Sequence, residues 1–141
     1  MKMSAFETAT AFFHACEGLQ GWEGCKQYVA ENAVFSAQSE PLVDIQLVEG
    51  YCEWMAGLGK GPLVGCGYSI HSSAWDEANR TALYFATFNG EHSGEGGPVP
   101  ATGGVTHSHY VYAITMDDDD KVCAMTKVWN APWALKELGW M

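Results

Sequence analysis

Two side chains near the end of the chain, the Tyr112 phenol and the Lys127 amine, have the chemistry of a proton-transfer pair. A lysine in an apolar pocket loses hydration, which disfavours its charged form and lowers its pKa from about 10.4. We expect the pKa of a phenol beside the ammonium group to fall as well. Such a pair could stabilise a developing oxyanion, an effect commonly worth about 3–4 kcal/mol, or the lysine could form a Schiff base with a carbonyl compound.

The pair belongs to a predicted β-hairpin. Residues 105–116 and 122–129 have the character of strands, and the four aspartates at 117–120 predict the turn between them. If these aspartates are the whole loop, six side chains from facing positions share one face of the hairpin. The predicted facing pairs are Tyr112 with Met125, Tyr110 with Lys127, and Ser108 with Trp129. A lone lysine among aromatic side chains and a methionine indicates a pocket lining or a neighbouring group elsewhere in the chain.

Lys127 also has structural interpretations, and the sequence leaves them open. Its ammonium group could lie over the ring of Trp129 or Tyr110 in a cation–π contact. It could instead form a salt bridge with Glu49 or Glu53, which both fall on a predicted helix. Under either interpretation the lysine contributes to packing and carries no chemistry.

His107 and His109 form the other suggestive pattern, because two imidazoles at alternate strand positions share one face. Such a pair can supply two metal ligands. Without a bulge, these side chains lie on the face opposite Tyr112, and no glutamate follows at a spacing that would complete a metal site. We therefore expect outward-facing histidines, no bound metal and no cofactor.

The composition predicts a single globular domain spanning residues 1–141. The chain is 48% hydrophobic and 17% charged, which separates it from disordered proteins. Its net charge of −10 argues against binding to nucleic acid or to membrane surfaces, since both need clustered basic side chains. No apolar run has membrane-spanning length, and the first residues lack the apolar block of a signal peptide. The five scattered cysteines predict free thiols and a cytoplasmic location.

Helical periodicity characterises the first 60 residues, and strand periodicity characterises most of the rest. Ser4 and Glu7 have capping-box spacing ahead of the first helix, and Asp44 is a candidate cap for a later one. Helices followed by consecutive strands predict an α+β fold with the helices on one face of a curved antiparallel sheet. The predicted helices span residues 5–17, 22–29, 45–58 and 131–138, and the predicted strands span 33–37, 64–76, 81–92, 105–116 and 122–129.

Residues 90–104 contain six glycines and two prolines, which predicts a loop. The segment has neither a dinucleotide-binding glycine pattern nor a Gly-Lys-Ser/Thr motif, so a phosphate site is not expected. We interpret it as a flexible flap over the mouth of a pocket.

Three stretches and the C-terminal ending, taken in order, point to a known fold. Phe12–Ala15 looks like a first-helix signature, and Glu31–Phe35 looks like the approach to a first strand. Residues 119–130 place a methionine, a lysine and a tryptophan at the spacing of a last strand, and residues 130–139 form a characteristic ending. Together they resemble the nuclear transport factor 2-like superfamily, which includes SnoaL-like polyketide cyclases and ketosteroid isomerases. The resemblance implies a cystatin-like α+β cone with an internal pocket.

The resemblance implies the position of a pocket, but several of the family's catalytic residues are missing from this sequence. The general base of the isomerases corresponds to Ala37, and their first-helix tyrosine corresponds to Phe12, so both functional groups are missing. Tyr112 occupies the place of the second oxyanion donor and retains a phenol. The histidine and aspartate of the cyclases fall near Tyr112 and Lys127. The positions expected to bind ligand beside this pair are Phe12, Ala37, Trp54, Tyr110, Met125 and Trp129.

These patterns predict a cofactor-independent isomerase or cyclase for a small apolar carbonyl compound. Tyr112 would stabilise the oxyanion, and Lys127 would assist proton transfer. The alternative is a non-catalytic ligand-binding or protein-interaction module of the same fold. The family resemblance and the apolar strand faces also predict a homodimer packed through the sheet.

Overall fold

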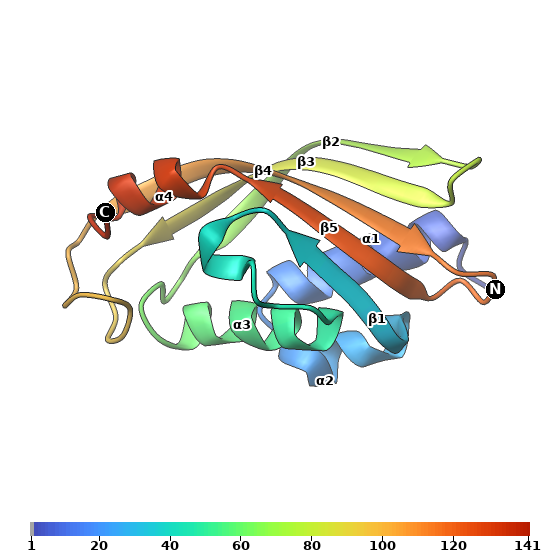
Figure 1. Ribbon diagram of the computed structural model, residues 1–141, viewed down its shortest axis with the longest axis horizontal. Coiled ribbons are helices and arrows are strands. Elements are labelled where there is room, and N and C mark those ends of the chain that lie inside the picture. Colours follow the sequence, from blue (N-terminus) through green and yellow to red (C-terminus); the bar gives the residue numbers. More distant parts are fainter. Residues whose placement is uncertain (1) are drawn as a thin grey trace.

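A curved sheet arches over three N-terminal helices, and a short fourth helix lies at one end of the molecule (Figure 1). The computed structural model describes residues 2–141. The predicted α+β class is confirmed. The elements in chain order are α1 (Ala5–Glu17), α2 (Gly21–Cys25), η1 (Lys26–Tyr28), β1 (Val29–Ala37), η2 (Glu40–Leu42), α3 (Val48–Lys60), β2 (Gly67–Asp76), β3 (Thr81–Glu91), β4 (Val105–Met116), β5 (Val122–Trp129) and α4 (Ala131–Glu137).

The two longest helices begin differently. Helix α1 has the predicted capping box, in which the Ser4 hydroxyl accepts from the Glu7 amide and the Glu7 carboxylate accepts from the Ser4 amide. The predicted cap of α3 at Asp44 is wrong, because α3 starts at Val48. Residues before it are held extended against β1, where the Phe35 amide donates to the Gln46 carbonyl. No helix within residues 2–141 combines the length and the apolar character needed to span a membrane.

The sheet has the strand order β1-β5-β4-β3-β2. Strands β2 to β5 pair antiparallel, as expected, but β1 pairs parallel to β5. The expectation of a wholly antiparallel sheet is therefore wrong. Strands β2 to β5 follow one another along the chain, whereas β1 reaches the sheet edge after crossing from the helical layer, so no hairpin dictates its direction.

The β4–β5 hairpin keeps the predicted face but not the predicted register. Tyr112 pairs with Lys127 and Tyr110 pairs with Trp129, a shift of two residues. Part of the shift arises because Lys121 belongs to the loop, where its carbonyl accepts from the Asp117 amide. The rest arises from a bulge at Cys123. Each change alone would reverse the faces of the strand, and the two together restore them.

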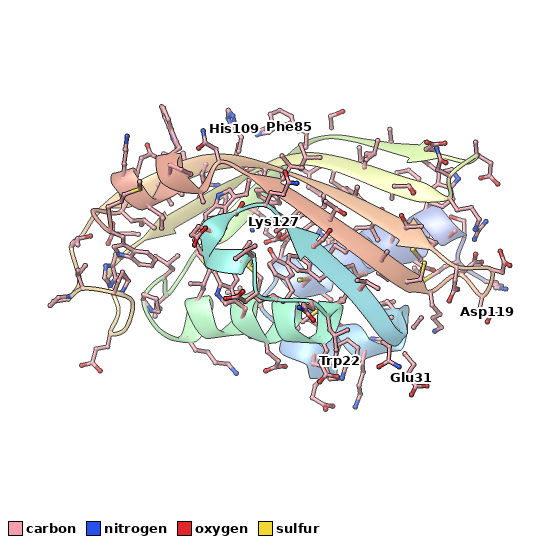
Figure 2. The ribbon with its side chains drawn as sticks, in the orientation of Figure 1. Trp22, Glu31, Phe85, His109, Asp119 and Lys127 are labelled. Carbon is pink, nitrogen blue, oxygen red and sulfur yellow. The ribbon has the colours of Figure 1, made fainter. Side chains whose placement is uncertain are left out.

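The inner face of the sheet packs on α1 and α3 to form the core. Every even-numbered residue of β4 from Thr106 to Met116 is buried, and Tyr112 and Ile114 are completely so. His107 and His109 are exposed on the outer face, as predicted. Figure 2 shows Phe85 and His109 projecting together from the side of the sheet away from the helices.

Candidate functional site

Lys127 lies in the interior, between the sheet and the helices (Figure 2). Only 6% of its surface is exposed. Strand β5 directs the side chain inward, and the amine donates to the Tyr51 hydroxyl of α3 over 2.9 Å. The Tyr51 hydroxyl in turn hydrogen-bonds with the Tyr112 hydroxyl. Lys127 and Tyr112 are therefore linked through a tyrosine that the sequence did not single out.

Aromatic rings surround the Lys127 amine. The Nζ atom lies 4.7 Å from the ring centre of Trp129 and 5.3 Å from that of Tyr110, so both predicted cation–π partners are present. The rings of Tyr51, Trp54 and Tyr112 lie within 5.8 Å of the same atom. These contacts stabilise the charged amine in a place with little access to water.

A buried carboxyl group completes the polar interior, and sequence reasoning missed it. Glu17, the last residue of α1, is 4% exposed. Its Oε1 atom and the Tyr110 hydroxyl are both buried without a hydrogen-bond partner. Glu17 stands four residues after Phe13, which places both on the inward face of the helix. This helical spacing from Phe13 is the feature of the sequence that could have predicted the burial of Glu17.

The predicted salt bridges to Glu49 and Glu53 do not form. Both side chains are exposed, and a Glu53 oxygen instead accepts from the Trp22 amide at 2.7 Å. Among the described residues, the ion pairs within 4 Å are Lys26 with Glu23 and Arg80 with Asp120. The Lys127 amine thus has hydroxyl and aromatic neighbours in direct contact and a carboxyl group farther away.

Burial dominates the titration of this interior. It lowers the pKa of Lys127 to about 8, and the negative charge of Glu17 acts in the opposite direction. Burial raises the pKa of Glu17, against the effects of Lys127 and of the Tyr112 and Tyr110 hydroxyls. The predicted downward shift of the Tyr112 phenol is wrong, because burial raises its pKa well above the ordinary value. Tyr112 is therefore a neutral phenol and not a phenolate.

A small apolar cavity of about 50 Å³ lies beside Lys127. Trp54 and Trp129, two of the residues expected to bind ligand, are part of its lining. The lysine is its one charged group, and most of the remaining lining is apolar. Such a volume exceeds the roughly 15 Å³ that one water molecule needs. The other lining residues are Pro41, Met55, Leu58, Leu63, Phe88, Thr106, Ala134, Leu135, Leu138 and Trp140.

The structure places several predicted ligand-binding residues elsewhere. Phe12, Tyr110 and Met125 are buried in the core and are not part of the cavity lining. Ala37 pairs with Lys127 across β1 and β5 and lines a second groove, of about 410 Å³, which Lys127 and Trp129 also line. Tyr112 does not line the cavity. It hydrogen-bonds with Tyr51, which accepts from the Lys127 amine, and Lys127 lines the cavity.

An open groove of about 600 Å³ adjoins the cavity and shares Trp54, Leu58 and Trp140 with it. Gly97 and Pro98 from the glycine-rich loop also line this groove, and the interpretation of the loop as a flap stays a prediction. Gly97 has a φ angle of 87°, and a Cβ atom there would lie 3.2 Å from the Trp140 ring. The loop can therefore approach the tryptophan closely only with glycine at this position.

His92 forms hydrogen bonds with the glycine-rich loop and with Trp140 near the end of the chain. The imidazole is fully buried, and its Nδ1 atom accepts from the Trp140 indole at 2.8 Å. Its Nε2 atom lies 3.0 Å from the Gly96 carbonyl, to which it donates as the neutral tautomer. One histidine thus connects the glycine-rich loop and the C-terminal segment, which both line the groove.

Comparison with known proteins supports the fold. No protein-family model matches the chain, and no curated protein matches it. Among solved structures, a protein of Jannaschia sp. CCS1 described as a SnoaL-like polyketide cyclase superposes with a TM-score of 0.77 at 16% identity, over 98% of this chain and 96% of the other. IdmH of Streptomyces antibioticus, described as a polyketide cyclase, superposes with a TM-score of 0.75 at 13% identity, over 97% of this chain and 99% of the other.

A third similar structure is a protein of Catenulispora acidiphila with a ketosteroid isomerase-like fold, solved in complex with trimethylamine. Its TM-score is 0.70 at 12% identity, over 94% of this chain and 92% of that one. The chain has the nuclear transport factor 2-like fold. At these identities the likeness concerns the fold and not the activity. Among residues 2–141, the buried Asp, Glu, Lys and Arg side chains are Lys127 and Glu17, while Ala37 and Phe12 have no titratable group.

Proposed function

We propose that the protein is a cofactor-independent acid–base enzyme of the isomerase or cyclase type, acting on a small apolar carbonyl compound. The observation that carries the proposal is the state of Lys127, which is 6% exposed, unpaired with a carboxylate within 4 Å among the described residues, and adjacent to an apolar cavity. Burial lowers its pKa to about 8, which brings it into the range useful for proton transfer near neutral pH.

In this proposal Lys127 is the group that touches the substrate. Its ammonium donates to the carbonyl oxygen and stabilises the negative charge that develops when the neighbouring carbon loses a proton to solvent in the adjoining open groove, and solvent returns a proton to the product carbon. Tyr51 holds the amine in place, and Tyr112 orients the Tyr51 hydroxyl. Tyr112 therefore acts through another residue, which differs from the direct contact expected from the sequence.

The substrate must extend beyond the cavity beside Lys127. That cavity holds about 50 Å³, whereas pockets for organic ligands commonly measure about 300–1,000 Å³. The adjoining groove adds about 600 Å³ and is lined by Trp54, Leu58 and Trp140. A compound with its carbonyl group at Lys127 and its apolar body in the groove fits both spaces.

A non-catalytic binding module of the same fold is the second candidate. The small size of the cavity favours it, together with the hydrogen bond and aromatic contacts that already satisfy the Lys127 amine. Under this alternative the same groove holds an apolar ligand, and Lys127 fixes its orientation.

Deuterium uptake separates the two candidates. A panel of small ketones and aldehydes is incubated in D₂O with the parent protein, and exchange at the carbons next to the carbonyl is followed by NMR. We expect exchange for at least one compound, and a loss of about 100-fold or more in Lys127→Met. Lys60→Met, which changes an exposed lysine, is the matched control and should retain the parent rate.

Two outcomes contradict the enzyme proposal. One is exchange that proceeds equally in the parent and in Lys127→Met. The other is a ligand-induced rise in melting temperature without any exchange, which supports the binding module. Treatment with borohydride adds a further distinction, because a Schiff base would leave a covalent adduct on Lys127.

We also propose that the protein is a homodimer packed through the outer face of the sheet. That face carries exposed apolar side chains, including Leu83 and Phe85 of β3 and Val128 of β5, which is 64% exposed. Burial of these side chains against a second copy would remove them from water.

A further inference from the structure

Three cysteine side chains from three different helices converge in the interior. Cys16 belongs to α1, Cys25 ends α2, and Cys52 belongs to α3. Each is completely buried, and the three Sγ atoms all lie within 4.8 Å of one another. The sequence separates them widely, so their spacing along the chain did not predict a site.

The separation of the sulfur atoms matches what a shared metal ion requires. An ion about 2.3 Å from each of three sulfur ligands, in their common plane, would hold the sulfurs about 4.0 Å apart. The observed Sγ–Sγ distances are at most 4.8 Å. Rotation of the cysteine side chains is enough to bring the sulfur atoms to the separation that a bound ion requires. Three helices therefore already hold the donors close to a ligating arrangement.

The donor set restricts the kind of ion. Within residues 2–141, no fourth His, Cys, Asp or Glu ligand atom joins the group. Structural zinc sites are almost always four-coordinate, so three sulfurs alone are a poor match for zinc. Thiolates favour soft ions, and Cu(I) is the physiological soft ion that accepts three sulfur ligands.

We propose that Cys16, Cys25 and Cys52 form a three-coordinate site for a soft, thiophilic metal ion of the Cu(I) class. The helix that carries Cys25 provides the route to this buried site. Helix α2 has five residues, and positive φ angles occur at its first residue, Gly21, and at Leu19 shortly before it. A helix this short gains little stability by itself, so it can open locally while α1 and α3 stay in place.

Anaerobic titration of the full chain with Cu(I), in competition with the chelator bicinchoninate, tests the proposal. We expect one tightly bound Cu(I) per chain, and X-ray absorption should detect three sulfur neighbours. Cys25→Ala should weaken Cu(I) binding by more than the roughly 10- to 100-fold that loss of an indirect partner costs. The double variant Cys66→Ala/Cys123→Ala is the matched control, because these thiols lie outside the cluster, and it should bind like the parent.

Alkylation of the parent protein provides a second measurement that does not depend on whether a variant folds. With free Cu(I) at about 100 times its Kd, opening of the site should become about 100-fold rarer. Labelling of Cys16, Cys25 and Cys52 should slow accordingly, while labelling of Cys66 and Cys123 continues. Binding that survives Cys25→Ala, equal slowing at all five thiols, or a preference for zinc over Cu(I) would overturn the proposal.

Discussion

Burial and aromatic contacts act on the Lys127 amine in opposite directions. Loss of water disfavours the ammonium form, whereas the Tyr51 hydroxyl and the surrounding rings stabilise it. Because the pKa falls to about 8, burial has the larger effect. At neutral pH the amine is still mostly protonated, which suits a proton donor better than a nucleophile.

The depressed pKa of Lys127 predicts an unusual pH dependence of stability. Between about pH 8 and pH 10 the unfolded chain holds the lysine proton more fully than the folded chain does, so stability rises with pH. Below about pH 8 both states are protonated, and the contribution stays at its least favourable value. We expect the free energy of unfolding of Lys127→Met, measured by urea denaturation, to lack this rise. An identical slope in the parent and in Lys127→Met would contradict the assignment.

The hydroxyl of Tyr51 should matter more to stability than that of Tyr112. Tyr51→Phe removes the acceptor of the Lys127 amine and leaves a buried ammonium group short of a partner, which costs about 1–3 kcal/mol. Tyr112→Phe removes only the hydrogen bond between two neutral hydroxyls. Chemical denaturation of both variants tests the order. A larger loss for Tyr112→Phe would show that the amine does not depend on Tyr51.

At the scale of elements, the glycine-rich loop depends on a contact from the end of the chain. His92 accepts from the Trp140 indole and pairs with the loop backbone at Gly103 and Gly104. Trp140→Phe keeps an aromatic ring but removes the donor, at a cost of about 1 kcal/mol. We expect hydrogen exchange of the loop amides to accelerate about fivefold, with little effect on β4 or β5.

The matched control for this loop prediction is Trp133→Phe, at a tryptophan that is 56% exposed on α4. It should leave exchange of the loop amides unchanged. Equal acceleration in the two variants would mean that the loop responds to the stability of the C-terminal segment as a whole and not to the His92 contact.

The β4–β5 hairpin shows how an element can keep its faces while its pairing changes. Its alternation predicted correctly that Tyr112 and Lys127 point inward. The exact partners depended on whether Lys121 joined the loop and whether Cys123 bulged, and neither feature has a strong local signal. Each is decided by hydrogen bonds that exist only once both strands are in place.

At the scale of the whole molecule, the exposed outer face of the sheet leads to a test of the dimer. Phe85→Glu places a charge among apolar side chains that the proposed interface would bury. We expect the parent to sediment as a dimer and Phe85→Glu to sediment as a monomer. Val99→Glu, which adds the same charge on the glycine-rich loop, should remain dimeric. A monomeric parent would exclude the proposed interface under the conditions measured.

The periodic features of this protein follow from its amino-acid pattern alone. Alternation set the inward face of β4 and β5, helical spacing set α1 with its Ser4 cap, and the order of elements set the α+β class. These features arise from contacts within an element or between neighbouring strands. For that reason they survive errors of a few residues in the predicted boundaries.

The contacts between groups far apart in the chain depend on how the folded elements pack. Tyr51 contacts Lys127 across 76 positions of the chain, and Trp140 contacts His92 across 48. The parallel pairing of β1 with β5, the enclosure of Glu17 and the convergence of three cysteines also depend on how the helices pack beneath the sheet. Such contacts leave no periodic trace in the sequence, because each is selected by the geometry of several elements at once.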